Sequence, residues 1–247
     1  MENTSLVALS RQLVLRRKLD VIANNVANLD TVGYKRLSLE LDEYKMPVAR
    51  ANTFQRRDQV HSFVEDWNTT ADFEEGPTET TGNPLDVVIQ GDAFFVVMTE
   101  GGQERYTRAG NFQIDETGRL VTADGHAVMG EGGEIVFAAN EKDVLINNDG
   151  TVATNVGPRG SLRLVSFADD AVLSHQGDNT FSASGTSLPA TDFMLKQGSI
   201  EKSNVEGIIE LTRLMEVTRA YESVSKMISE HDDLRSKAIE RLGDTTA

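Results

Sequence analysis

The C-terminal part of the chain has an apolar pattern that predicts one long helix. Its apolar side chains alternate three and four residues apart, at Leu214, Val217, Tyr221, Val224 and Ile228. No Gly or Pro lies between Gly207 and Gly243, so a helix of about ten turns is permitted. Heptad spacing of this kind forms one narrow apolar stripe, and such a stripe needs a partner to bury it.

The N-terminal part has the same spacing. The stripe consists of Ala8, Leu15, Leu19, Ile22, Val26 and Leu29, with Gln12 as a polar exception, and a second stripe of Leu6, Leu9 and Leu13 lies beside it. We expect a helix that begins near Thr4 or Ser5, either of which can cap it, and runs to about Asn28. The simplest arrangement pairs the two terminal helices, and helices with such narrow stripes also assemble with copies from other chains.

The end of the first helix has an unusual run of amides. Three Asn residues fall within the five positions from Asn24 to Asn28, and Asn is costly inside a helix because its amide competes for backbone groups. One interpretation is a fraying helix end with Gly33 as the stop signal. The other is that small Ala23 and Ala27 allow close helix approach while the amides fix the register of an assembly.

Between the helices the pattern changes to short apolar runs separated by turn residues. The runs are Leu85–Gln90, Ala93–Met98, Asn111–Ile114, Arg119–Thr122, Ala127–Met129, Glu134–Phe137, Asp143–Ile146, Thr151–Thr154, Ser161–Phe167 and Asp192–Lys196. The separators, such as Asp115–Gly118 and Asp124-Gly125, supply residues that accept positive φ in hairpin turns. This spacing predicts a small antiparallel sandwich or irregular barrel.

The fold class predicted from these patterns is α+β, with paired coiled-coil-type terminal helices flanking a central irregular all-β domain. We divide the chain into an N-terminal helix at 1–36, an extended linker region at 37–81, a central β domain at 82–197 and a C-terminal helix at 198–247. The linker assignment rests on a mixed, weakly periodic pattern that contains Pro47 and the polar run Asn68–Thr70.

Composition limits the classes of partner. The 247 residues are 39% hydrophobic with a formal charge of −15, which argues against disorder and against nucleic acid or anionic membrane as main partners. From Glu65 to Glu100 there are nine acidic residues and no Lys or Arg. This segment is interpreted as a solvated face, with a docking surface for a basic partner as the alternative.

The chain has no Cys and no apolar run of about 18 residues, the length needed to span a membrane. Charged residues from Arg11 to Asp20 interrupt the N-terminal segment, so a cleaved signal peptide is not expected.

Sequence motifs of enzymes are missing. The four His residues are dispersed, and there is no nucleophile elbow, phosphate-binding loop or dinucleotide fingerprint. The run Leu145–Gly150 resembles a calcium loop faintly, but its first and twelfth positions would be Leu145 and Val156, which cannot coordinate calcium. We therefore expect no catalytic residue, no cofactor and no metal.

Several motifs resemble those of the bacterial flagellar axial proteins, the family of rod and hook subunits. The N-terminal signature corresponds to Ala23–Asn28 followed by Thr31 and Gly33–Arg36, and the C-terminal signature to Gly198–Val205 with Glu210–Thr212 and Arg219–Glu222. Central segments of the family are similar to Gly82–Phe95, Tyr106–Phe112 and Asp115–Gly125. The resemblance covers both termini and most of the middle, in the same order. Ala93 and Tyr34 depart from it, since the family usually has Gly and Phe there.

The resemblance implies a structural subunit that assembles through its terminal helices into the helical drive shaft of the flagellar rod. The modest length favours the proximal rod over the hook, with a distal-rod subunit as the alternative. Implied partners are other rod subunits, copies of this chain and the flagellar type III export apparatus, which uses no cleaved leader. The implied location is the periplasmic rod of the basal body, without membrane insertion.

The assembly interface predicted on this basis comprises Leu15, Leu19, Ile22, Asn24, Asn25, Val26, Asn28, Gly33, Tyr34, Leu211, Leu214, Val217, Tyr221, Val224 and Ile228. In this hypothesis the Asn residues fix register, and Tyr34 with Lys35 marks the exit of the chain from the helical layer. Outside the family, a secreted adhesin with helical stalks and a carbohydrate-active β enzyme remain as alternatives.

Overall fold

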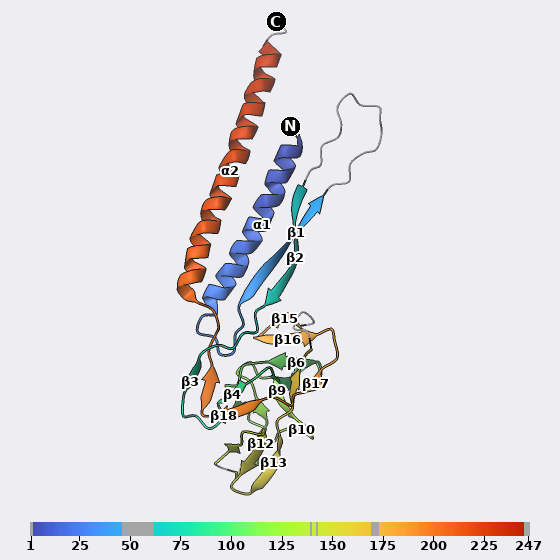
Figure 1. Ribbon diagram of the computed structural model, residues 1–247, viewed down its shortest axis with the longest axis vertical. Coiled ribbons are helices and arrows are strands. Elements are labelled where there is room, and N and C mark those ends of the chain that lie inside the picture. The colour runs from blue at the N-terminus through green and yellow to red at the C-terminus, as the bar shows by residue number, and fades with distance from the viewer. Residues whose placement is uncertain (1, 46–61, 139, 142, 169–172, 245–247) are drawn as a thin grey trace. The chain divides into compact units, whose positions relative to one another are not determined.

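A computed structural model describes residues 2–45, 62–138, 140–141, 143–168 and 173–244 (Figure 1). Within these residues the chain forms two compact units. The first, which we call the helical unit, comprises Met1–Val26, Leu37–Thr69 and Gly207–Ala247. The second, the β unit, comprises Ala27–Arg36 and Thr70–Glu206. Each unit is built from segments that are far apart in the sequence.

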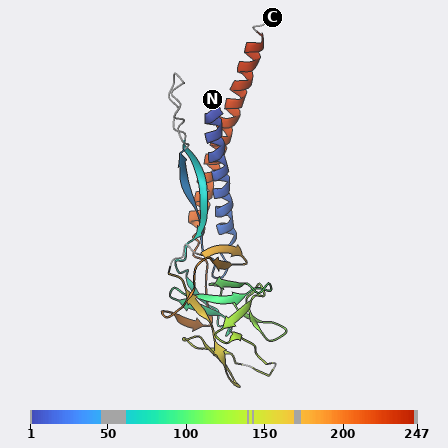
Figure 2. The same cartoon turned by 90° about the vertical axis from the view of Figure 1, so that its right-hand side faces the viewer.

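Two long helices and a strand pair make up the helical unit. Its elements are α1 (Glu2–Ala27), β1 (Leu37–Lys45), β2 (Ser62–Ala71, whose last two residues belong to the β unit) and α2 (Gly207–Asp244). The helices lie alongside each other and run in opposite directions in two perpendicular views (Figures 1 and 2). The sequence pattern placed the end of α1 within one residue of its observed position, but the N-terminal helix segment given as 1–36 is too long, because Ala27–Arg36 belong to the β unit.

A buried amide connects α1 to β1. The Asn25 side chain donates from Nδ2 to the Leu37 carbonyl oxygen at 2.9 Å, and its Oδ1 accepts from the Leu37 N–H, also at 2.9 Å. Asn25 and Leu37 are 1% and 8% exposed. The Asn amide therefore acts like the edge of a neighbouring strand, and it satisfies two main-chain groups that would otherwise be buried without partners.

The interval at 37–81, predicted as an extended linker, contains paired strands. β1 and β2 form a two-stranded sheet, and β3 (Thr78–Thr80) pairs with β19 (Ser199–Glu201). The signal for β1 is present in the sequence, since Leu37, Leu39 and Leu41 alternate with polar residues, and this is the period of a strand with one buried face.

The β unit is all-β and antiparallel in its pairings. Besides β3 and β19, its strands are β4 (Val87–Gln90), β5 (Phe94–Met98), β6 (Glu104–Thr107), β7 (Gln113–Ile114), β8 (Leu120–Val121), β9 (Ala127–Gly130), β10 (Gly133–Glu134), β11 (Leu145–Ile146), β12 (Thr151–Thr154), β13 (Gly157–Ser161), β14 (Leu164–Ser166), β15 (Leu173–Gly177), β16 (Thr180–Ala183), β17 (Leu188–Pro189) and β18 (Met194–Gln197). The main sheet follows the order β15-β16-β6-β5-β9-β8-β7, with β10 beside β9 and β14 between β5 and β17. The α+β class predicted from the sequence is confirmed.

Each of the ten predicted apolar runs overlaps a strand. Strands such as β6 and β15 were missed because their residues are mostly polar. They form because neighbouring strands supply hydrogen-bonding partners, as when Phe95–Met98 of β5 pairs with Glu104–Thr107 of β6. Pairing of this kind depends on context more than on intrinsic strand propensity.

Strand β5 is the centre of the β unit, and both of its faces are buried. Phe95 and Val97 point into one apolar cluster, and Phe94 and Val96 point into another. Alternate side chains of a strand project to opposite faces, so one fully apolar strand contributes to two cores. The smaller sheets complete the larger core, through Val87, Ile89, Ile146, Val152 and Leu195.

The turn from Asp115 to Gly118 shows how the predicted hairpin chemistry works. The Asp115 carboxylate accepts hydrogen bonds from the Thr117 hydroxyl at 2.7 Å and from the Arg119 N–H at 2.9 Å. These bonds to Thr117 and Arg119 hold the pKa of Asp115 well below its ordinary value. Gly118 has φ of 85°, and a Cβ there would lie 2.2 Å from the Phe137 carbonyl oxygen. The turn therefore requires glycine for two reasons.

The segment at 198–247, predicted as a helix, is helical only from Gly207. Residues 199–201 are β19, and residues up to Glu206 belong to the β unit. Gly198, with φ of 73°, lies in the turn that separates β18 from β19.

Phe95 is fully buried and packs edge-on against Phe112, with ring centroids 4.9 Å apart. We expect Phe95→Ala to destabilise the β unit by about 3–5 kcal/mol, because it leaves a cavity at the centre of the sheet. The exposed Ile114→Ala is the control and should change stability by less than about 0.5 kcal/mol. Chemical denaturation followed by circular dichroism measures both, and equal effects of the two changes would contradict the central role of β5.

Asn25→Leu should destabilise the helical unit by about 2–6 kcal/mol, since it leaves the N–H and C=O of Leu37 buried without their partner, at about 1–3 kcal/mol each. The adjacent, exposed Asn24→Leu serves as the control. Hydrogen exchange of the Leu37 amide distinguishes the two variants. Unchanged protection of that amide in Asn25→Leu would show that the side chain does not hold β1.

Candidate assembly surface

The inward face of α2 consists of residues at heptad positions. Val217 and Val224 are buried, and Leu214, Tyr221 and Ile228 between and beyond them are half-buried. Up to Arg241, the other apolar side chains of α2 are exposed, apart from the half-buried Ala220. The five residues that the spacing predicted as a stripe are therefore the ones covered within the chain.

The covered face of α1 is wider than the predicted stripe. Ala8, Val14, Ile22 and Asn25 are buried, and Leu15, Leu19 and Val26 are half-buried. Val14 was not predicted, because it lies outside the three-four spacing. At Asn25 the helix has partners on two sides, since that side chain bonds both to β1 and to α2.

A buried carboxylate fixes the pairing of the helices at one end. Glu210 is 1% exposed, and its Oε2 accepts from Asn25 Nδ2 at 3.4 Å while its Oε1 accepts from Arg213 Nη1 at 2.5 Å. Glu210 lies in the first turn of α2, where the helix dipole favours negative charge. It occupies the heptad position before Leu214, and only its polarity kept it out of the predicted stripe.

The other end of α2 extends beyond its partner. With Asn25 opposite Glu210 and equal rise in both helices, the start of α1 lies level with about residue 233 of α2. Beyond that level, Leu234 and Ile239 are 67% and 66% exposed. The last turns of α2 therefore carry apolar side chains that nothing in the described chain covers, and the extension is visible in Figures 1 and 2.

Both helices also present apolar side chains away from each other. On α1 these are the second predicted stripe of Leu6, Leu9 and Leu13, and on α2 they are Ile208, Leu211 and Met215, all at least 48% exposed. Leu211, a predicted interface residue, thus belongs to the outward face. We refer to these six residues as the outer apolar face.

The three Asn residues differ in their surroundings. Asn25 is buried between α1, β1 and α2, whereas Asn24 is exposed. Asn28 is half-buried and lies in the turn after α1, where its Oδ1 accepts from the Thr31 hydroxyl at 3.0 Å and its carbonyl from the Thr31 N–H at 3.3 Å. Asn28 thus fits the interpretation of a helix end, whereas Asn25 joins elements of this chain and Ala23 and Ala27 are exposed; a role of the amides in the register of an assembly stays a prediction.

Gly33 and Tyr34, also predicted as interface residues, lie in the interior of the β unit. A Cβ on Gly33 would lie 2.5 Å from the Ala109 nitrogen. Tyr34 is 2% exposed, and its ring packs edge-on against His175 with centroids 6.4 Å apart. Their side-chain positions therefore serve the fold of this chain and not a surface contact with a neighbour.

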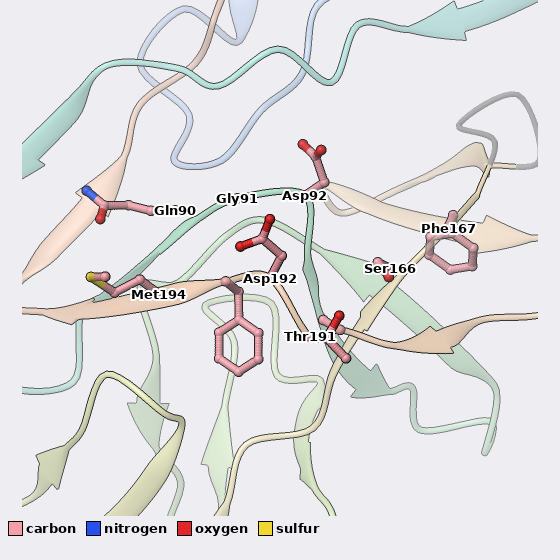
Figure 3. Close-up of a pocket in the computed structure, with 10 residues that line it drawn as sticks. Gln90, Gly91, Asp92, Ser166, Phe167, Thr191, Asp192 and Met194 are labelled. Carbon is pink, nitrogen blue, oxygen red and sulfur yellow. The ribbon is translucent and has the colours of Figure 1, made fainter.

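The β unit contains an open hollow of about 490 Å³ (Figure 3). Asp92 and Asp192 line it from two segments, together with Thr191 and Ser166. Both carboxylates belong to exposed residues of the β unit.

Among the described residues, no three His, Asp or Glu side chains form a group that could hold a metal ion. None of the described helices combines the length and the hydropathy required to cross a membrane.

Three segments of the chain match protein-family profiles. Residues 6–35 match the flagella basal body rod protein family, residues 88–154 the D1 domain of the flagellar hook protein FlgE/F/G family, and residues 196–241 the C-terminal domain of the flagellar basal body rod FlgEFG proteins. The first and last matches cover most of α1 and α2, and the middle match lies in the β unit.

Individual relatives are similar over nearly the whole chain. The flagellar basal-body rod protein FlgF of Caulobacter vibrioides is 39% identical, covering 98% of this chain and 99% of the relative, and FlgF of Mesorhizobium japonicum is 32% identical with the same coverage. The rod protein FlgG of Caulobacter vibrioides is 33% identical over 87% of this chain and 90% of the relative. With these identities and family matches at both termini and in the middle, the chain belongs to the flagellar basal-body rod protein family.

Proposed function

We propose that this protein is a structural subunit of the proximal part of the flagellar rod and that it assembles through its terminal helices. The observation that carries the proposal is the outer apolar face, which the chain leaves exposed on both helices. The helices thus use one side for each other and have a second side for neighbouring subunits.

The positions of these apolar side chains are compatible with a tubular assembly. The side chains on α1 and those on α2 form two different surfaces. A contact between the α1 surface of one subunit and the α2 surface of the next is therefore head-to-tail. Contacts of this kind that do not close a ring generate a helical filament. In this proposal the neighbours are copies of this chain and other rod subunits, and the covered helix faces hold each subunit together.

The proximal position is supported by the relatives. The chain aligns with two FlgF proteins over 98% of its length, and its matches to FlgG proteins cover 87–90% of it. A distal-rod subunit is the second candidate. Export through the flagellar type III apparatus to the periplasmic rod, without a cleaved leader, completes the proposal, and no catalytic role is part of it.

Deletion of the gene tests the function and the position together. We expect loss of flagella and of swimming, with basal bodies in electron micrographs whose proximal rod is incomplete and whose distal rod is absent. Complementation with the wild-type gene is the control. Normal filaments in the deletion strain would overturn the structural role, and basal bodies that contain a complete proximal rod would favour the distal-rod candidate.

Val217→Asp tests the role of the helices. Val217 is 7% exposed at the centre of the covered face of α2, and a carboxylate there is expected to prevent pairing with α1 because a buried charge without a partner costs several kcal/mol. The variant should fail to restore swimming while the β unit keeps its thermal transition.

Ser225→Asp, which places the same carboxylate on an exposed position of α2, is the matched control and should restore swimming. Normal motility with Val217→Asp would show that helix pairing is not required for rod assembly.

A further inference from the structure

The chain passes between its two units at four places, and three segments of the β unit lie close to them in sequence. The segments are Gly33–Arg36, Asp72–Pro77 and Glu201–Asn204. Gly33–Arg36 precedes β1, Asp72–Pro77 follows β2, and Glu201–Asn204 precedes α2. We call them the connecting segments.

Hydrogen bonds join the connecting segments to one another inside the β unit. The Gly33 N–H donates to the Glu201 carbonyl at 2.7 Å, and the Lys202 N–H donates to the Pro77 carbonyl at 2.9 Å. The Asn204 side chain accepts from the Arg36 N–H at 2.7 Å and donates to the Asp72 carbonyl at 2.8 Å.

A buried ion pair lies among these bonds. Lys35 Nζ is 2.7 Å from Glu201 Oε1 and also donates to the carbonyl oxygens of Glu74 at 2.6 Å and Phe73 at 3.3 Å. The same Glu201 oxygen accepts from the Gly76 N–H at 2.8 Å. One ammonium and one carboxylate, 0% and 2% exposed, therefore bond to all three connecting segments.

A second buried cation approaches from the end of β6. Arg108 is 1% exposed, its Nη1 lies 3.8 Å from Glu201 Oε2, and its guanidinium lies 5.0 Å from the centre of the Phe94 ring. Arg108 thereby connects the cluster to β5, the central strand of the sheet.

The buried charges of Lys35, Arg108 and Glu201 are weak evidence for a gain in folding stability. Burial lowers the pKa of Lys35 even though Glu201 raises it, so the loss of hydration outweighs the attraction of the carboxylate. Well-packed apolar residues in place of a buried ion pair are often equally stable or more so. Such charges can instead favour one arrangement of the surrounding chain, since only that arrangement satisfies them.

We propose that Lys35, Arg108 and Glu201 form a clamp of positioning residues that holds the three connecting segments in one register. The clamp sets where the chain leaves the β unit toward β1 and α2 and where it enters the β unit after β2. Its importance for assembly rests on the proposed function, whereas its effect on register can be measured in the purified chain.

The test replaces the whole cluster, because removal of one partner would leave a buried charge. In the triple variant Lys35→Met, Arg108→Met and Glu201→Leu, the β unit should keep its melting temperature within about 5 °C. The amides of Gly33, Arg36 and Lys202 should nevertheless exchange at least about tenfold faster than in the wild type. In the deletion strain the triple variant should fail to restore swimming.

The matched control removes another ion pair of the β unit, that of Arg163 with Glu104 at 3.0 Å, which contacts none of the connecting segments. Arg163→Met with Glu104→Leu should leave exchange at Gly33, Arg36 and Lys202 unchanged. A folded triple variant with normal protection of those amides would overturn the proposal, whatever the outcome of the gene deletion.

A second variant keeps the proposal testable if the triple variant does not fold. Asn204 is half-buried, so Asn204→Ala should fold, and it removes only the amide bonds between the segments. The clamp predicts that the Gly33 and Lys202 amides stay protected in this variant. If these amides lose their protection, Asn204 and not the charged residues holds the connecting segments in register, and the proposal is overturned.

Discussion

The two helices of this protein depend on one constraint, which is that a narrow apolar stripe is stable in water only when something covers it. The stripe on α2 is covered by α1, which comes from the opposite end of the sequence. The polypeptide must therefore return to its starting point after completing the β unit. Asn25, Leu37 and Glu210 mark the place where this return is fixed, because their buried polar groups satisfy one another.

The β unit is stabilised in a different way. Its central strand β5 contributes to two cores at once, so this unit has apolar cores of its own, although some apolar side chains such as Leu145, Val156 and Met194 are exposed. In contrast, α1 and α2 are long helices that keep an outer apolar face and an overhanging end. A structural subunit can therefore contain a domain with its own apolar cores and still expose apolar helix surface for contacts with neighbouring subunits in a polymer.

Buried polar residues occur where the chain changes direction. Asn25 and Glu210 lie next to the ends of α1 and α2, and Lys35 and Glu201 lie in the connecting segments. Apolar packing accepts several registers at similar energy, whereas a buried amide or ion is satisfied in few. Apolar stripes thus provide the attraction between elements, and these polar groups select one arrangement.

The periodic features could be predicted from the sequence: the class of the fold, the two helices with the end of α1, the covered stripe of α2 and the ten apolar strand runs. These follow from spacing and local turn chemistry, which a single segment carries, whereas the family was identified from the resemblance of motifs at both termini and in the middle. Only the tertiary structure decided that 37–81 contains paired strands, that Val14 and Glu210 are covered, and that Gly33 and Tyr34 lie inside the β unit. Their surroundings come from segments up to about 185 residues away, such as Glu210 beside Asn25. Burial of that kind is a property of contacts between distant segments, and local pattern does not contain it.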